Sequence, residues 1–149
     1  MPTLGLVVAE FYEDLAAAME ERALERAADR EAAVAETVRV PGVYDAPLAA
    51  DRLARRDDID AVAVLGVVIS GDTDHDQVVA HAAARRLGDV SLARDTPVTF
   101  GVQGPAMSGA EARERVAKGA RAVPAALDLV EALPERDRRE RGASRFSGR

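Results

Sequence analysis

Proton transfer at neutral pH is a task for histidine, and the chain of 149 residues holds two histidines and no cysteine. His75 follows a Gly71-Asp72-Thr73 segment, between the most apolar part of the chain and a segment with helical character. The unpaired backbone N–H groups of a helix start would favour an anion such as phosphate. Gly71 would allow close approach and Thr73 would add a hydroxyl donor. The alternative is that Asp72 or Thr73 only caps the helix and that His75 is a surface residue.

The sequence favours no metal site. His81 follows His75 by six residues, which puts the two imidazoles on different faces of one helix, so we expect His81 to be a packing residue. Asp72, Asp74 and Asp76 offer hard oxygen ligands but lack the remaining positions of a calcium loop. The absence of cysteine removes disulfides, thiolate ligands and cysteine nucleophiles.

Two aromatic residues follow apolar segments and could contact a flat ligand. Phe11 comes just after the first such segment, where its ring could stack on a heterocycle or simply belong to the core. Tyr44 lies in Pro41-Gly42-Val43-Tyr44-Asp45, where Val43 and Tyr44 offer apolar surface and Asp45 accepts hydrogen bonds. The alternative is a plain strand-to-helix turn with Asp45 as the helix N-cap.

Basic residues recur at helical spacing near the C-terminal part of the chain, at Arg113, Arg115, Lys118 and Arg121. Such a row of charges is usually a solvated helix face. One of these guanidinium groups would clamp a phosphate if it lay near Gly71.

The segments that carry these residues alternate between strand and helix patterns. Short apolar segments predict strands at 3–9, 36–40, 61–69 and 96–102. Helical spacing predicts helices at 11–30, 46–56, 74–87 and 108–133, the last with a capping box formed by Ser108 and Glu111. This alternation predicts an α/β fold, a flavodoxin-like three-layer sandwich with a four-stranded parallel sheet and helices on both faces. Ligands of such sheets bind beyond the carboxyl ends of the strands.

Composition and charge limit the partners. The net charge of −6 disfavours nucleic acid. Residues 134–149 hold six arginines and three acids without apolar periodicity, so we expect a domain at 1–133 and a flexible, Arg-rich tail at 134–149. The charge of this tail alone would suit nucleic acid. The longest apolar segment, 61–69, is too short to span a membrane, and the N-terminal residues lack a secretory signal. We therefore expect a cytoplasmic protein.

Four separated blocks of the chain, taken in order, resemble the lumazine synthase family. The blocks are residues 8–11, 40–49, 65–75 and 97–102. The stretch 104–108 and Glu114-Arg115 resemble one branch of the family, and the whole resemblance runs over about residues 4–133.

The resemblance implies a transferase that needs no metal or organic cofactor. Members condense 5-amino-6-(D-ribitylamino)uracil with 3,4-dihydroxy-2-butanone 4-phosphate to 6,7-dimethyl-8-ribityllumazine, with release of phosphate and water. This is the penultimate step of riboflavin biosynthesis. The resemblance also implies a homopentamer with each active site between neighbouring subunits. It leaves open a sixty-subunit shell and riboflavin synthase as a partner.

The resemblance also assigns roles by position. His75 would be the acid/base. The residues that would bind the ribitylaminouracil are Phe11, Val43, Tyr44, Asp45, Val67, Val68, Ile69, Phe100 and Arg121. Among these, Phe11 would stack on the ring, residues 67–69 would use their backbone, and Phe100 would come from the neighbouring subunit. The residues that would bind phosphate are Gly71, Asp72, Thr73 and Arg115.

Three positions depart from the common family pattern. Tyr12 replaces a small polar residue, Asp45 replaces a longer Glu, and Asp76 replaces an aromatic residue. Two other functions share the resemblance: a riboflavin synthase of the related fold, which dismutates two lumazines, and a non-catalytic lumazine-binding or shell protein. The predicted phosphate site favours lumazine synthase over both alternatives, because lumazine itself carries no phosphate.

Overall fold

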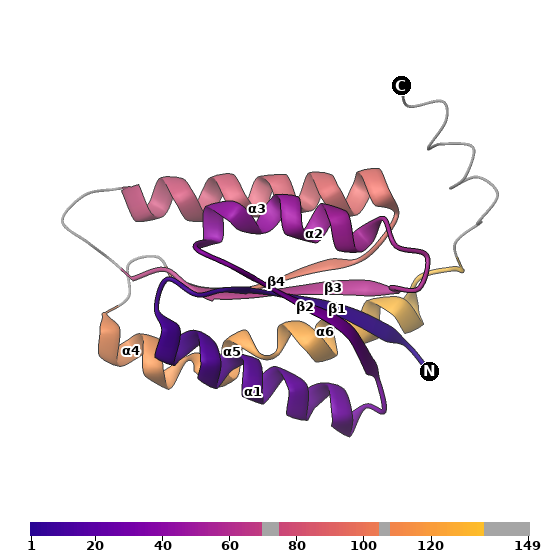
Figure 1. Ribbon diagram of the computed structural model, residues 1–149, viewed down its shortest axis with the longest axis horizontal. Helices are drawn as coiled ribbons and strands as arrows, with labels where there is room; N and C mark the ends of the chain where they lie inside the picture. Colours follow the sequence, from indigo (N-terminus) through magenta and orange to yellow (C-terminus); the bar gives the residue numbers. More distant parts are fainter. Residues whose placement is uncertain (70–74, 105–107, 136–149) are drawn as a thin grey trace.

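A sheet of four parallel strands forms the middle layer of the molecule (Figure 1). The computed structural model describes residues 1–69, 75–104 and 108–135. The strands are β1 (Thr3–Ala9), β2 (Ala33–Val40), β3 (Ala61–Val67) and β4 (Val98–Gln103), in the spatial order β2-β1-β3-β4. Parallel neighbours require crossovers, which the intervening helices supply. The predicted flavodoxin-like three-layer α/β fold is confirmed.

Helices cover both faces of this sheet (Figure 1). The 3-10 turn η1 (Val43–Asp45), α2 (Ala46–Ala54) and α3 (His75–Arg94) lie on one face. The other face carries α1 (Glu13–Asp29), α4 (Gly109–Glu114), α5 (Val116–Gly119) and α6 (Ala122–Ala132). Every residue of β3 is buried because the strand has neighbours on both edges and helices on both faces.

The predicted helix at 108–133 is wrong as one element, because the chain forms three helices there. Pro124 explains the break between α5 and α6. A proline in a helix interior lacks the N–H for the ladder and costs about 3 kcal/mol, whereas the first turn needs no such donor. Restarting the helix at Ala122 puts Pro124 in that first turn. The predicted contact between Ser108 and Glu111 is present: Ser108 Oγ accepts from the Glu111 N–H at 3.2 Å.

The break also lets the chain approach β4 closely. A Cβ atom at Gly101 would lie 2.5 Å from the Gly119 carbonyl oxygen, and a Cβ at Gly119 would lie 2.8 Å from the Gly101 oxygen. Only glycine at both positions permits this backbone contact. Thr99 completes the attachment, since its Oγ1 donates to the Ala122 carbonyl at 2.7 Å.

Two predicted elements were too short. β2 begins three residues before the predicted start, where the Ala33 N–H donates to the Pro2 carbonyl at 3.0 Å. α3 continues seven residues past the predicted end at 87. A tertiary contact supports this extension: Arg94 Nε donates to Asp51 Oδ1 of α2 at 2.8 Å. Neither contact is visible in a local hydrophobic pattern.

Burial alone would raise the pKa of Asp51, but the hydrogen bonds and charges of Arg94 and Arg55 hold the pKa of this carboxyl below its usual value. The ion pair therefore joins α2 to the C-terminal part of α3, and Arg55 lies 2.6 Å from the same carboxylate.

From residue 136 on, the predicted tail lies outside the described residues. None of the helices in the described ranges is apolar over enough length to traverse a bilayer.

Candidate active site

Phe11 lies exposed at the carboxyl edge of the sheet. It follows β1 by two residues, and 74% of its surface is accessible, so the interpretation of Phe11 as a core residue is wrong. Its ring packs edge-on against Tyr12, with centroids 5.0 Å apart and an angle of 75° between the planes. Tyr12 in turn packs on the core beneath α1. One aromatic ring thus presents a free surface while its neighbour supports it.

The turn after β2 splits its side chains between core and solvent. Val43 is buried and packs near Gly66 of β3, whose absent side chain leaves the room that Val43 fills. Tyr44 is 69% exposed. Asp45 precedes α2 without capping it, because its Oδ2 accepts instead from the Gly42 N–H at 3.1 Å. A ligand at this edge would therefore meet the Tyr44 ring and the backbone, not the Val43 side chain.

Residues 67–69, at the end of β3, turn their side chains inward. Val67 and Val68 are buried and Ile69 is partly buried, so polar contacts at 67–69 fall to the backbone. The Val68 N–H donates to the Gln103 carbonyl at 2.8 Å. Next to it, Gly104 has a φ of +99°, and a Cβ there would lie 1.8 Å from the Val68 oxygen. The ends of β3 and β4 are thereby joined directly.

His75 is the first residue of α3 and is exposed. α3 also packs against η1, which carries Tyr44. The predicted phosphate residues Gly71, Asp72 and Thr73 lie outside the described residues. The expectation that His81 is a packing residue is wrong for this chain alone, because His81 is exposed on α3. Among the described residues no cluster of His, Asp or Glu is suited to hold a metal.

Three predicted site residues come from the β4 side of the sheet. Phe100 lies in the edge strand β4 and is 40% exposed. Arg115 and Arg121 immediately precede α5 and α6 and are both exposed. The turn η1, which carries Tyr44, follows the other edge strand, β2, in the chain, but it packs against α3, and its Val43 reaches Gly66 of β3.

Similarity to known proteins identifies the family. The family model described as 6,7-dimethyl-8-ribityllumazine synthase matches residues 2–134. The chain belongs to this family. Two relatives with the same description, from Halobacterium salinarum and Halorubrum lacusprofundi, are 66% and 62% identical over 133 residues, which is 89% of this chain and 100% and 99% of theirs. A relative from Methanocaldococcus jannaschii is 47% identical over 89% of this chain and 94% of its own length.

The lumazine synthase family consists of transferases of riboflavin biosynthesis. Sequence reasoning found the exposed rings and the histidine, but it missed the glycines that hold the strand ends together. Gly66 lies within residues 65–75 and Gly104 begins the stretch 104–108, and glycines in strands are a known sign of close backbone approach.

Proposed function

We propose that this chain is a lumazine synthase that condenses 5-amino-6-(D-ribitylamino)uracil with 3,4-dihydroxy-2-butanone 4-phosphate, releasing phosphate and water. The observation that carries the proposal is the exposed Phe11 ring at the carboxyl edge of the sheet that also bears Tyr44 and the β3 end. A flat heterocycle gains from stacking on such a ring, and its polar edge would meet backbone groups of residues 67–69. Family membership over residues 2–134 supplies the reaction.

The reaction needs two reactive molecules held together more than it needs strong chemistry. The amine of the uracil attacks the ketone to give an imine with loss of water, and phosphate then leaves. The ribitylamino nitrogen attacks the remaining carbonyl and closes the ring with loss of a second water. His75, at the start of α3, would move protons in these steps. The start of α3 with Gly71, Asp72, Thr73 and Arg115 would hold the phosphate and stabilise its charge as it departs.

We also propose that the working form is a homopentamer in which neighbouring copies complete each site. Phe11 and Tyr44 are 74% and 69% exposed, which is unusual for large apolar rings unless a ligand or partner covers them. Val78 of α3 is exposed as well, at 64%. A second copy would bring Phe100, and with it Arg121, to the ring-binding side. The same surface would also serve assembly into a sixty-subunit shell and contact with riboflavin synthase.

The proposal extends to the domain organisation and the location of the enzyme. Residues 1–133 would form the catalytic domain, to which residues 134–149 are an appended tail. The enzyme would act in the cytoplasm without a metal or organic cofactor.

The test is turnover of the two substrates without added cofactor, followed by lumazine fluorescence and by release of phosphate. We expect one phosphate for each lumazine. His75→Ala should slow the reaction about a hundredfold, the lower end of the range for acid–base residues, because the substrates are themselves reactive. His81→Ala is the matched control on the same helix and should leave the rate unchanged.

Other outcomes would decide for other functions. Formation of riboflavin from lumazine alone would indicate a riboflavin synthase. Tight lumazine binding without turnover would indicate a binding protein. Equal rates for wild type and His75→Ala would remove His75 from the site.

A further inference from the structure

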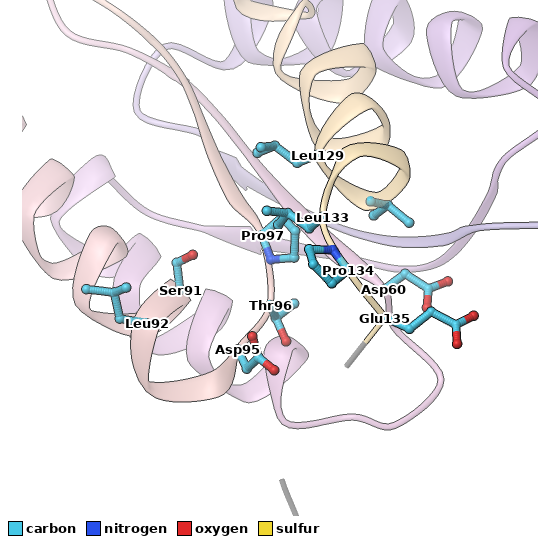
Figure 2. A pocket seen from close by; sticks show the side chains of 11 residues that line it. Asp60, Ser91, Leu92, Asp95, Thr96, Pro97, Leu129, Leu133, Pro134 and Glu135 are labelled. Atoms are coloured by element: carbon cyan, nitrogen blue, oxygen red, sulfur yellow. The ribbon is translucent and has the colours of Figure 1, made fainter. Parts of the chain in front are cut away.

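A cavity of about 700 Å³ lies at the amino ends of β3 and β4 (Figure 2). Phe11 and His75 follow the carboxyl ends of β1 and β3, at the other end of the sheet. Asp60 and Pro97 immediately precede β3 and β4, and the other walls come from the C-terminal parts of α3 and α6. None of the residues assigned to the reaction lines this cavity. Its volume is within the range of sites that bind small molecules or side chains.

The lining of the cavity is acidic and apolar. Three carboxylates, from Asp60, Asp95 and Glu135, line it, and no Arg or Lys is among its described lining residues. Its leucines are unusually exposed: Leu92 at 85% and Leu133 at 51%. Carboxylates repel phosphates and other anions, so the cavity does not suit the proposed phosphate substrate. It suits a peptide that carries both guanidinium groups and an aromatic ring.

The segment 136–149 has this chemistry. Its sequence, RDRRERGASRFSGR, contains six arginines, two acids and one aromatic residue, Phe146, so its net charge is +4. It continues directly from Glu135, which itself lines the cavity. An extended chain covers about 3.3 Å per residue, so only a few residues separate the rim from any part of the cavity.

The segment is also an addition to what the family shares. The family model ends at residue 134. The Halobacterium salinarum relative is matched over its whole length by 133 residues of this chain, which leaves none of its residues to match such a segment. The family reaction therefore does not account for the charge of 136–149.

We propose that residues 136–149 bind to this cavity of their own chain. The arginines face Asp60, Asp95 and Glu135, and Phe146 packs on Leu92, Leu129 and Leu133. The segment thereby covers the most exposed leucines at this end of the sheet. It does not reach the proposed reaction site, which lies at the other end.

The experiment uses the full-length chain, in which an introduced cysteine pair is unique because the sequence has no cysteine. Ser147→Cys places one thiol beside Phe146 and Ser91→Cys places the other in the cavity wall. The control pairs Ser147→Cys with Ala93→Cys, which lies two residues further along the same helix on its other side and does not line the cavity. Disulfide formation under mild oxidation is followed by mass and by gel mobility without reductant.

Binding raises the local concentration of the two thiols, so the Ser91 pair should close about tenfold faster than the Ala93 pair, within one chain. Asp95→Asn with Glu135→Gln should bring the two rates together. Asn suits position 95 because Asp95 has a φ of +50°, which asparagine tolerates. Glu21→Gln with Glu25→Gln removes two charges from α1, away from the cavity. In this control the Ser91 pair should still close about tenfold faster than the Ala93 pair. Turnover should not change in any of these variants, which separates this test from that of the proposed function.

Equal closure rates for the two pairs would overturn the proposal. Disulfides that join two chains would also overturn it, because they would assign the segment to a neighbouring copy. Trypsin supplies a measurement without cysteines: cleavage after the arginines of 136–149 should be several-fold slower in wild type than in Asp95→Asn with Glu135→Gln. Equal cleavage would contradict the proposal.

Discussion

The ring of Tyr12 meets the ring of Phe11 edge-on, with centroids 5.0 Å apart and planes at 75°. This is the favoured geometry for an aromatic pair, in which the positive edge of one ring meets the negative face of the other. Phe11 is otherwise exposed, whereas Tyr12 is fixed on the core. Tyr12 therefore limits the orientations of the ring that is proposed to stack on the uracil.

Two substitutions at position 12 distinguish the effect of the aromatic ring of Tyr12 from the effect of its apolar volume. Tyr12→Leu keeps an apolar side chain on the core but loses the aromatic pair. Because such a pair contributes about 0.5–1.5 kcal/mol, KM for the ribitylaminouracil should rise about two- to tenfold with little change in kcat. Tyr12→Phe should restore the wild-type KM. Steady-state kinetics measure both, and an unchanged KM in Tyr12→Leu would show that Phe11 needs no support.

Asp51 gives a prediction for stability. Its pKa is lowered in the folded state, so its contribution is fully present above the unfolded pKa of about 3.9 and is lost as the pH falls through the folded value. Asp51→Asn should lower the free energy of unfolding at pH 7 by about 1–2 kcal/mol, since the carboxylate is only 16% exposed and accepts from Arg94. Below about pH 4 the difference from wild type should shrink.

Urea unfolding at fixed protein concentration measures this difference, because assembly would couple stability to concentration. Asp58→Asn is the matched control. A hydrogen bond from Arg56 lowers the pKa of Asp58 too, but the pair is exposed, so solvent screening leaves little effect. Two results would refute the role given to Asp51. One is an equal loss of unfolding free energy in Asp51→Asn and Asp58→Asn, and the other is a difference between Asp51→Asn and wild type that grows as the pH falls.

The sequence predicted the layers of the fold because β3 is apolar throughout and because apolar strand segments alternate with longer helical segments. It also placed Phe11 and Tyr44 shortly after strands and His75 near the start of a helix. Local patterns did not show where side chains would point: Val43 was expected to offer surface and is buried, because the room it fills is made by Gly66 on another strand. The extension of α3 likewise depends on Asp51, 43 residues away in the chain.

Complementation between two damaged copies tests the central claim, which is that one site is built from two chains. Chains with His75→Ala and chains with Phe100→Ala, carrying different tags, would be produced separately and together, and mixed assemblies purified through both tags. In a ring of five formed at random from equal amounts, about one interface in four would join an intact His75 to an intact Phe100. We predict that the mixed assemblies form lumazine at about a quarter of the wild-type rate, well above either parent. A rate no higher than the mean of the two parents would contradict the account.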